Sequence, residues 1–114
     1  MKKLNMFLQF DWDGFARDKA FQVTDVKPLR DREHSETILG TVVELVILKD
    51  DTDYQTKPGE VVSNLYEKLR VKIPRSSVDV QVGDSVELVN PVATVFGDYR
   101  NQLSVKADDV LVLE

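Results

Sequence analysis

The chain has 114 residues, of which 42% are hydrophobic and 31% charged, and it contains no cysteine. This composition predicts one globular domain and excludes disulfides, thiolate metal sites and a cysteine nucleophile. The formal net charge of −5 argues against a high-affinity, non-specific binder of duplex DNA but does not exclude a local basic groove.

The N-terminal residues do not have the pattern of an export signal. Lys2 and Lys3 supply positive charge, but the apolar stretch that follows is broken by Asn5 and Gln9 and has no small-residue cleavage site. No apolar run approaches the roughly 20 residues that a membrane helix needs. We therefore expect a soluble, cytoplasmic protein without a membrane segment.

Residues 1–19 are rich in aromatic side chains but have no clean period of two or 3.6. The four rings are Phe7, Phe10, Trp12 and Phe15. Large aromatic surfaces are rarely left in water, so we expect an irregular segment that packs on a domain formed by residues 20–114. The alternative is a stacking platform or docking arm, which the neighbouring aspartates disfavour because they would repel phosphate.

The first strands are predicted at residues 21–29 and 37–48. The first has β-branched and aromatic character, and Pro28 should end its pairing or mark an edge; the second is dense in Val, Ile, Thr and Leu. Gly40 lies inside the second, twelve-residue strand, where it would allow a bulge or bend. Residues 49–60 are a hydrophilic loop with a Pro58-Gly59 turn.

The acidic cluster of this loop invites a calcium interpretation. Counted from Asp51, the EF-hand pattern places Thr56 where glycine is needed and Val62 where a bidentate glutamate is needed. We therefore predict no metal site and no cofactor.

Residues 65–75 are the most informative stretch. A strand sends alternate residues to opposite faces, so Leu69, Val71 and Ile73 would point to the core and the intervening cations to solvent. The exposed row would be Tyr66, Lys68, Arg70 and Lys72. The stretch carries four basic residues against one acid, or +3, which leaves −8 for the rest of the chain.

Two other interpretations of this stretch remain open. The apolar residues are also spaced as one face of a short helix over residues 60–69, which would remove Tyr66 and Lys68 from the row. The row is also compatible with an ordinary two-faced strand, whose lysines protect a solvated edge. We favour the strand because the segment between Pro58 and Pro74 is rich in β formers.

Further short strands are predicted at residues 85–90, 92–96, 103–106 and 110–113, with a hairpin loop at 97–101. Six or seven strands with short turns indicate an all-β sandwich or barrel. The long bent strand and the late hairpin favour a small, closed or partly open Greek-key barrel of the OB type.

Three blocks in the C-terminal half resemble the YdcP-like proteins of Gram-positive conjugative transposons, whose members are called helicase processivity proteins. The blocks are VKIP at residues 71–74, VELVNPVA at 86–93 and VKADDVLV at 105–112. The resemblance covers roughly residues 70–113. It implies an OB-like fold and a role in replicating mobile DNA, by binding single strands and helping a host helicase.

One position departs from the family. Its members carry an aromatic pair just before KADD, where this chain has Leu103 and Ser104. A stacking ring is therefore missing, or its task has moved to Tyr99 or Phe96.

Catalytic chemistry has little support. His34, the one histidine, lies in a charged turn without a G-x-S-x-G context or a glycine-rich phosphate loop. Asp108 and Asp109 are typical of a turn that starts the last strand. We expect a protein that is not an enzyme.

Two hypotheses follow. In the first, the protein binds single-stranded DNA as a replication accessory, with cations on phosphates and rings stacked on bases. The cations are Lys68, Arg70, Lys72, Arg75 and Arg100, and the rings are Tyr66 and Tyr99. In the second, it is an interaction or self-assembling module whose acidic surface addresses a basic partner such as a helicase or relaxase, without direct DNA binding.

Overall fold

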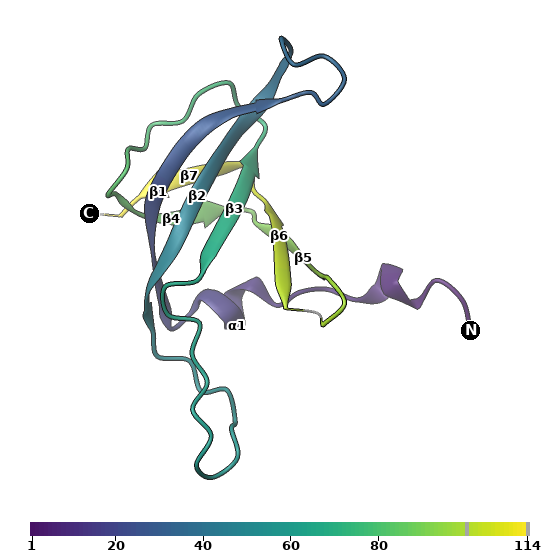
Figure 1. Ribbon diagram of the computed structural model, residues 1–114, viewed down its shortest axis with the longest axis vertical. Helices are drawn as coiled ribbons and strands as arrows, with labels where there is room; N and C mark the ends of the chain where they lie inside the picture. The colour runs from purple at the N-terminus through teal and green to yellow at the C-terminus, as the bar shows by residue number, and fades with distance from the viewer. Residues whose placement is uncertain (100, 114) are drawn as a thin grey trace.

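The structure is a computed structural model that describes residues 1–99 and 101–113. It is an all-β protein with seven strands and two short helices in this part of the chain (Figure 1). In chain order the elements are η1 (Leu4–Phe7), α1 (Trp12–Ala16), β1 (Lys19–Arg30), β2 (Ile38–Asp50), β3 (Lys68–Ile73), β4 (Ser85–Val89), β5 (Val92–Phe96), β6 (Gln102–Lys106) and β7 (Asp109–Val112). Neither helix is long and apolar enough to cross a membrane.

Strands β1 and β2 form a long, bent antiparallel hairpin, which dominates Figure 1. The register shifts at three places, where Thr24, Leu39 and Leu48 are each an extra residue without a partner. Such bulges bend a strand and increase its twist. Pro28 is paired with Thr41 of β2, and its other side is free because β4 pairs with β1 only at the start of that strand.

Gly40 is required by close packing at the end of β3. A Cβ atom at this position would collide with the backbone carbonyl of Ile73. The bulge itself falls on the neighbouring Leu39. The glycine of the long strand therefore allows β2 to approach the end of β3, which the sequence pattern alone did not indicate.

The prediction of a strand from residue 65 is wrong at its start, and the helical alternative is also wrong. Strand β3 begins at Lys68, and residues 64–67 form a turn in which Glu67 N donates to Asn64 O. Tyr66 and Glu67 both bond to Ile47, which makes a bulge at the entry to β3. Tyr66 has a φ of 68° in this turn, a conformation that usually selects glycine.

The last four strands form one continuous hairpin. The β4–β7 pairs run from Val86↔Val112 to Val89↔Asp109, and the β5–β6 pairs continue from Val92↔Lys106 in the same register. The β4 end of this hairpin pairs with β1, and its β6 arm pairs in parallel with β3. The resulting order is β5-β6-β3-β2-β1-β4-β7, so the sheet curls round but is not closed by hydrogen bonds.

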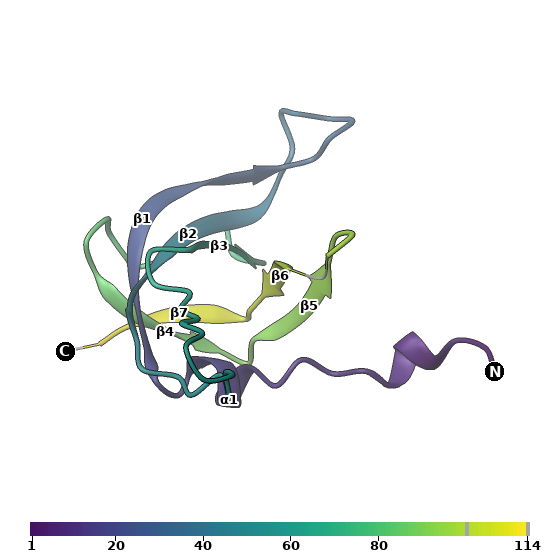
Figure 2. The ribbon, with the colours of Figure 1, turned by 60° about the horizontal axis from the view of Figure 1, so that its bottom comes forward.

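The core fills the inside of this curled sheet. Its fully buried side chains include Val43, Leu45, Val71 and Val105. The N-terminal rings Phe10, Trp12 and Phe15 pack against the core, and Trp12 stacks on Phe21 with ring centroids 5.7 Å apart. Helix α1 therefore covers one end of the sheet (Figure 2).

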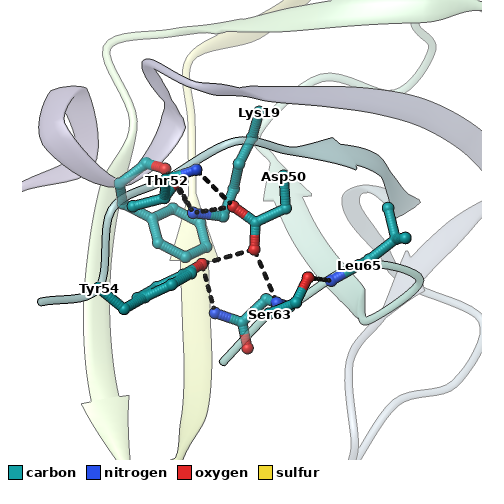
Figure 3. Close-up of polar contacts among 8 residues, drawn as sticks. Lys19, Asp50, Thr52, Tyr54, Ser63 and Leu65 are labelled. Carbon is teal, nitrogen blue, oxygen red and sulfur yellow. Dashed lines mark hydrogen bonds and ion pairs between the residues drawn. The ribbon is translucent and has the colours of Figure 1, made fainter. Parts of the chain in front are cut away.

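A buried ion pair anchors the long loop between β2 and β3. Lys19 Nζ lies 3.4 Å from Asp50 Oδ1, and it donates to Phe15 O and Thr52 Oγ1 at 2.8 Å each (Figure 3). Asp50 Oδ2 accepts from Tyr54 Oη at 2.6 Å and from the backbone N–H of Asn64 at 2.7 Å. The cluster ties both ends of residues 51–64 to the start of β1, and so positions the turn that leads into β3.

Candidate nucleic-acid interface

Strand β3 separates its side chains by polarity. Leu69, Val71 and Ile73 are buried, whereas Lys68, Arg70 and Lys72 are exposed. The three cations follow one another at every second position, so they lie on one face of the strand. That face is turned away from the core.

An open groove of about 890 Å³ adjoins this strand. Four cations contribute to its lining: Arg32, Lys68, Arg70 and Lys72. The one carboxylate among its described lining residues is Glu67. The groove therefore carries +3 in a chain whose net charge is −5, so positive charge is concentrated around this hollow of an otherwise acidic protein.

The opposite wall of the groove is the β5–β6 hairpin. It contributes Phe96, Gln102 and Ser104, and Phe96 is 47% exposed. The groove exists because β3 and β6 pair only at Val71↔Val105 and Lys72↔Lys106. Over residues 68–70, β3 has no strand partner on this side in the described part of the chain, and its edge is left open towards the hairpin.

One cation of the row already has a carboxylate partner. Glu44 Oε1 lies 3.5 Å from Lys68 Nζ and accepts a 3.0 Å hydrogen bond from Thr24 Oγ1. The bond from Thr24 and the charge of Lys68 hold the pKa of Glu44 below its ordinary value, against the opposing effect of burial. No carboxylate in residues 1–99 and 101–113 lies within ion-pair distance of Arg70 or Lys72, so the charges of these two residues are not neutralised by such a partner there.

A second row of cations crosses the sheet at Lys72. Lys27 of β1 is paired with Val42 of β2, Val42 with Lys72, and Lys72 with Lys106 of β6. Directly paired residues share a face, so Lys27, Lys72 and Lys106 extend the basic surface across four strands. The row along β3 and the row across the sheet meet at Lys72.

Three of the other residues predicted to bind do not line the groove. Tyr66 and Tyr99 are exposed but do not line it. Arg75 lines a different hollow, and its Nε lies 3.7 Å from Asp109 Oδ2. Arg100 lies outside the described residues. The structure thus brings Lys68, Arg70 and Lys72 together along one groove, whereas Tyr66, Arg75 and Tyr99 are not among the residues that line it.

Sequence reasoning missed three cations of this surface. Arg32 lies in the connection between β1 and β2, far in sequence from β3, and Lys27 and Lys106 face the same way as Lys72 only because of strand register. Phe96 was named only as a substitute ring. The sequence feature that could have identified Phe96 is its position at the end of a strand that leads into the 97–101 loop.

Comparison with known proteins adds no assignment: no protein-family model, curated protein or solved structure matches the chain.

Proposed function

We propose that the protein is a non-catalytic single-stranded DNA-binding accessory protein that acts in the replication or transfer of a mobile element and assists a helicase or relaxase. The observation that carries this proposal is the +3 groove beside an exposed Phe96 in a chain of net charge −5. Proteins that bind single strands without sequence preference combine a cationic groove with aromatic rings on which bases stack.

The proposed fold is a partly open barrel of the OB type. Its support is the antiparallel order β1-β2-β3, the parallel β3–β6 pair and the single hairpin that links the two sides of the sheet. OB-folds bind oligonucleotides on the face of strands 2 and 3, between the loop after strand 1 and the loop of the last hairpin. Arg32, Lys72 and Phe96 come from the corresponding three elements.

In the proposed complex, Arg70, Lys72 and Arg32 contact phosphates and Phe96 stacks on a base. One base stack contributes about 1–3 kcal/mol. Each neutralised phosphate contributes about −0.7 to the slope of log affinity against log salt concentration. The acidic remainder of the chain repels a polyanion, so binding is confined to the groove and weakens steeply with salt.

A fluorescence anisotropy titration with labelled oligo-dT at low salt tests the proposal. Replacing Arg32, Arg70 and Lys72 together by Glu should abolish binding. The matched control replaces Arg17, Lys49 and Lys57 by Glu, because these exposed cations lie outside the groove and the net charge changes equally.

Retention of binding by the control, together with its loss from the groove variant, supports the proposal. Equal affinities of the two variants, or no binding by the wild type at micromolar concentration, would rule it out. Phe96→Ala should weaken binding by about 5- to 150-fold, whereas Tyr99→Ala should leave it unchanged.

The alternative function is an interaction module without direct DNA binding. The observation that favours it is the pair of free sheet edges, β5 and β7, in the described sheet. Unprotected edges are templates for pairing with another chain. Absence of oligo-dT binding, with retention of complex formation with a helicase, would favour this function over the first.

A further inference from the structure

The N-terminal arm, residues 1–9, exposes apolar side chains that its own domain does not cover. Phe7 is 78% exposed and Leu8 64%, and Leu4 is half exposed. The neighbouring rings Phe10 and Trp12 pack on the core, so Phe7 differs from them in having no described partner. Isolated exposed apolar residues are common, but a projecting group of them marks a contact site.

The edge of β7 is a second uncovered apolar surface. Leu111, Val112 and Leu113 are consecutive and are 46%, 43% and 48% exposed. Edge strands are usually protected by lysine, proline or a covering segment, and β7 contains neither of these residue types. A hollow of about 280 Å³ lies between β7 and residues 75–79, and Val78, Leu111 and Val112 are among the residues that line it.

The two surfaces have opposite charge. The arm contains Lys2 and Lys3 and no acid, so it contributes +2 to a chain of net −5 and the remainder carries −7. Carboxylates outnumber cations around the β7 edge. Asp79 and Asp109 line the hollow together with Arg75, which pairs with Asp109, and the exposed Glu87 of β4 is paired with Leu111. A basic, apolar arm therefore matches an acidic, apolar edge.

The two surfaces also lie on opposite sides of the molecule. In both Figure 1 and Figure 2 the arm extends away from the sheet on one side, while β7 runs towards the other. Two different, complementary patches at opposite ends of a chain produce a heterologous contact, which adds copies in series and does not close at two.

We propose that the N-terminal arm of one copy docks on the β7 edge of a second copy, so that the protein assembles head to tail. Phe7 and Leu8 cover Leu111 to Leu113, and the lysines of the arm face the carboxylates around the edge. The assembly does not depend on DNA binding. On a single strand it would align successive grooves and make binding cooperative.

Sedimentation velocity of the full chain without DNA tests this assembly. The wild type should sediment faster as its concentration rises, without a plateau at the dimer, and added salt should reverse the effect. An arm variant, Phe7→Ser with Leu8→Ser, and an edge variant, Leu111→Lys with Leu113→Lys, should each weaken self-association by more than about tenfold. Val92→Lys on the β5 edge is the matched control and should associate like the wild type.

Mixing the two defective variants distinguishes head-to-tail contacts from symmetric ones. The edge variant keeps its arm and the arm variant keeps its edge, so an equimolar mixture should form a dimer and nothing larger. A mixture that stays monomeric overturns the proposal, as does self-association of either variant at wild-type strength. Circular dichroism establishes that each variant is folded, which is expected because all four substituted side chains are exposed.

Discussion

Lys19 and Asp50 form an ion pair whose two side chains are completely buried, with 3.4 Å between Nζ and Oδ1. Neither charge is left without hydrogen-bond partners, because Lys19 also bonds to Phe15 O and Asp50 to the Tyr54 hydroxyl. The ammonium group lies 4.1 Å from the centroid of the Phe15 ring, which adds a cation–π contact. The pair joins α1, the start of β1 and the end of β2.

Replacing Asp50 by Ala should destabilise the fold strongly, because the charge of Lys19 would stay buried without compensation. The expected loss in the free energy of unfolding is about 3–5 kcal/mol, measured by urea denaturation. Asp51→Ala is the control, since its ion pair with Lys49 is exposed and should contribute less than about 1 kcal/mol. Similar losses for the two variants would contradict this account.

The same carboxylate predicts how stability responds to acid. Burial raises the pKa of Asp50, but hydrogen bonds from Tyr54, Asn64 and Thr52 outweigh it and hold the pKa far below its ordinary value. The stabilisation is therefore complete above about pH 4 and is lost as the pH falls towards the folded pKa. As the pH is lowered from about 4 to about 2, the urea midpoint of unfolding should fall more steeply for the wild type than for Asp50→Asn.

Glu44→Gln should strengthen binding of single-stranded DNA by a few-fold. The substitution removes a negative charge from the cationic face and releases Lys68 from its ion pair, while the amide oxygen can still accept from Thr24. Anisotropy titration of oligo-dT measures the change. Glu60→Gln removes the same charge from an exposed position that neither lines the groove nor pairs with Lys68, so an equal gain in both variants would show that only net charge matters.

Tyr66→Gly should stabilise the protein by up to about 1.5 kcal/mol. Relief of the left-handed backbone contributes about 1–2 kcal/mol and the flexibility of glycine costs about 0.5–1 kcal/mol. Leu65→Gly, in the same turn but without a positive φ, should lower the melting temperature. Because Tyr66 does not line the groove, the affinity of the Tyr66→Gly variant for oligo-dT should stay within about twofold of that of the wild type. A large loss of affinity would indicate that Tyr66 contacts the bound strand.

Gly40→Ala should destabilise the fold by about 1–3 kcal/mol. Its Cβ would meet the backbone carbonyl of Ile73, which cannot move without disturbing the Thr41↔Ile73 pair. Thermal unfolding measures the loss, and Leu39→Ala at the exposed neighbouring position should change stability much less. If Gly40→Ala left the stability unchanged, this would mean that β3 can shift at this end.

Much of the local structure follows from the order of residues. Alternation along residues 68–73 predicts which side chains of β3 face solvent, because a strand has a period of two. The β-branched runs indicate β1 and β2, and Asn90-Pro91 marks the break between β4 and β5. The start of β3 was misplaced because Tyr66 occupies a left-handed position that its residue type does not signal.

The sequence by itself determined the all-β class, the two-faced β3 and the concentration of positive charge there, since these depend on neighbours along the chain. Only the tertiary structure decided that Arg32 and Phe96 join Arg70 and Lys72 in one groove, and that Tyr99 does not. Strand register and the short β3–β6 pairing bring these residues together. Register depends on how the whole sheet packs around its core, so no local pattern encodes it.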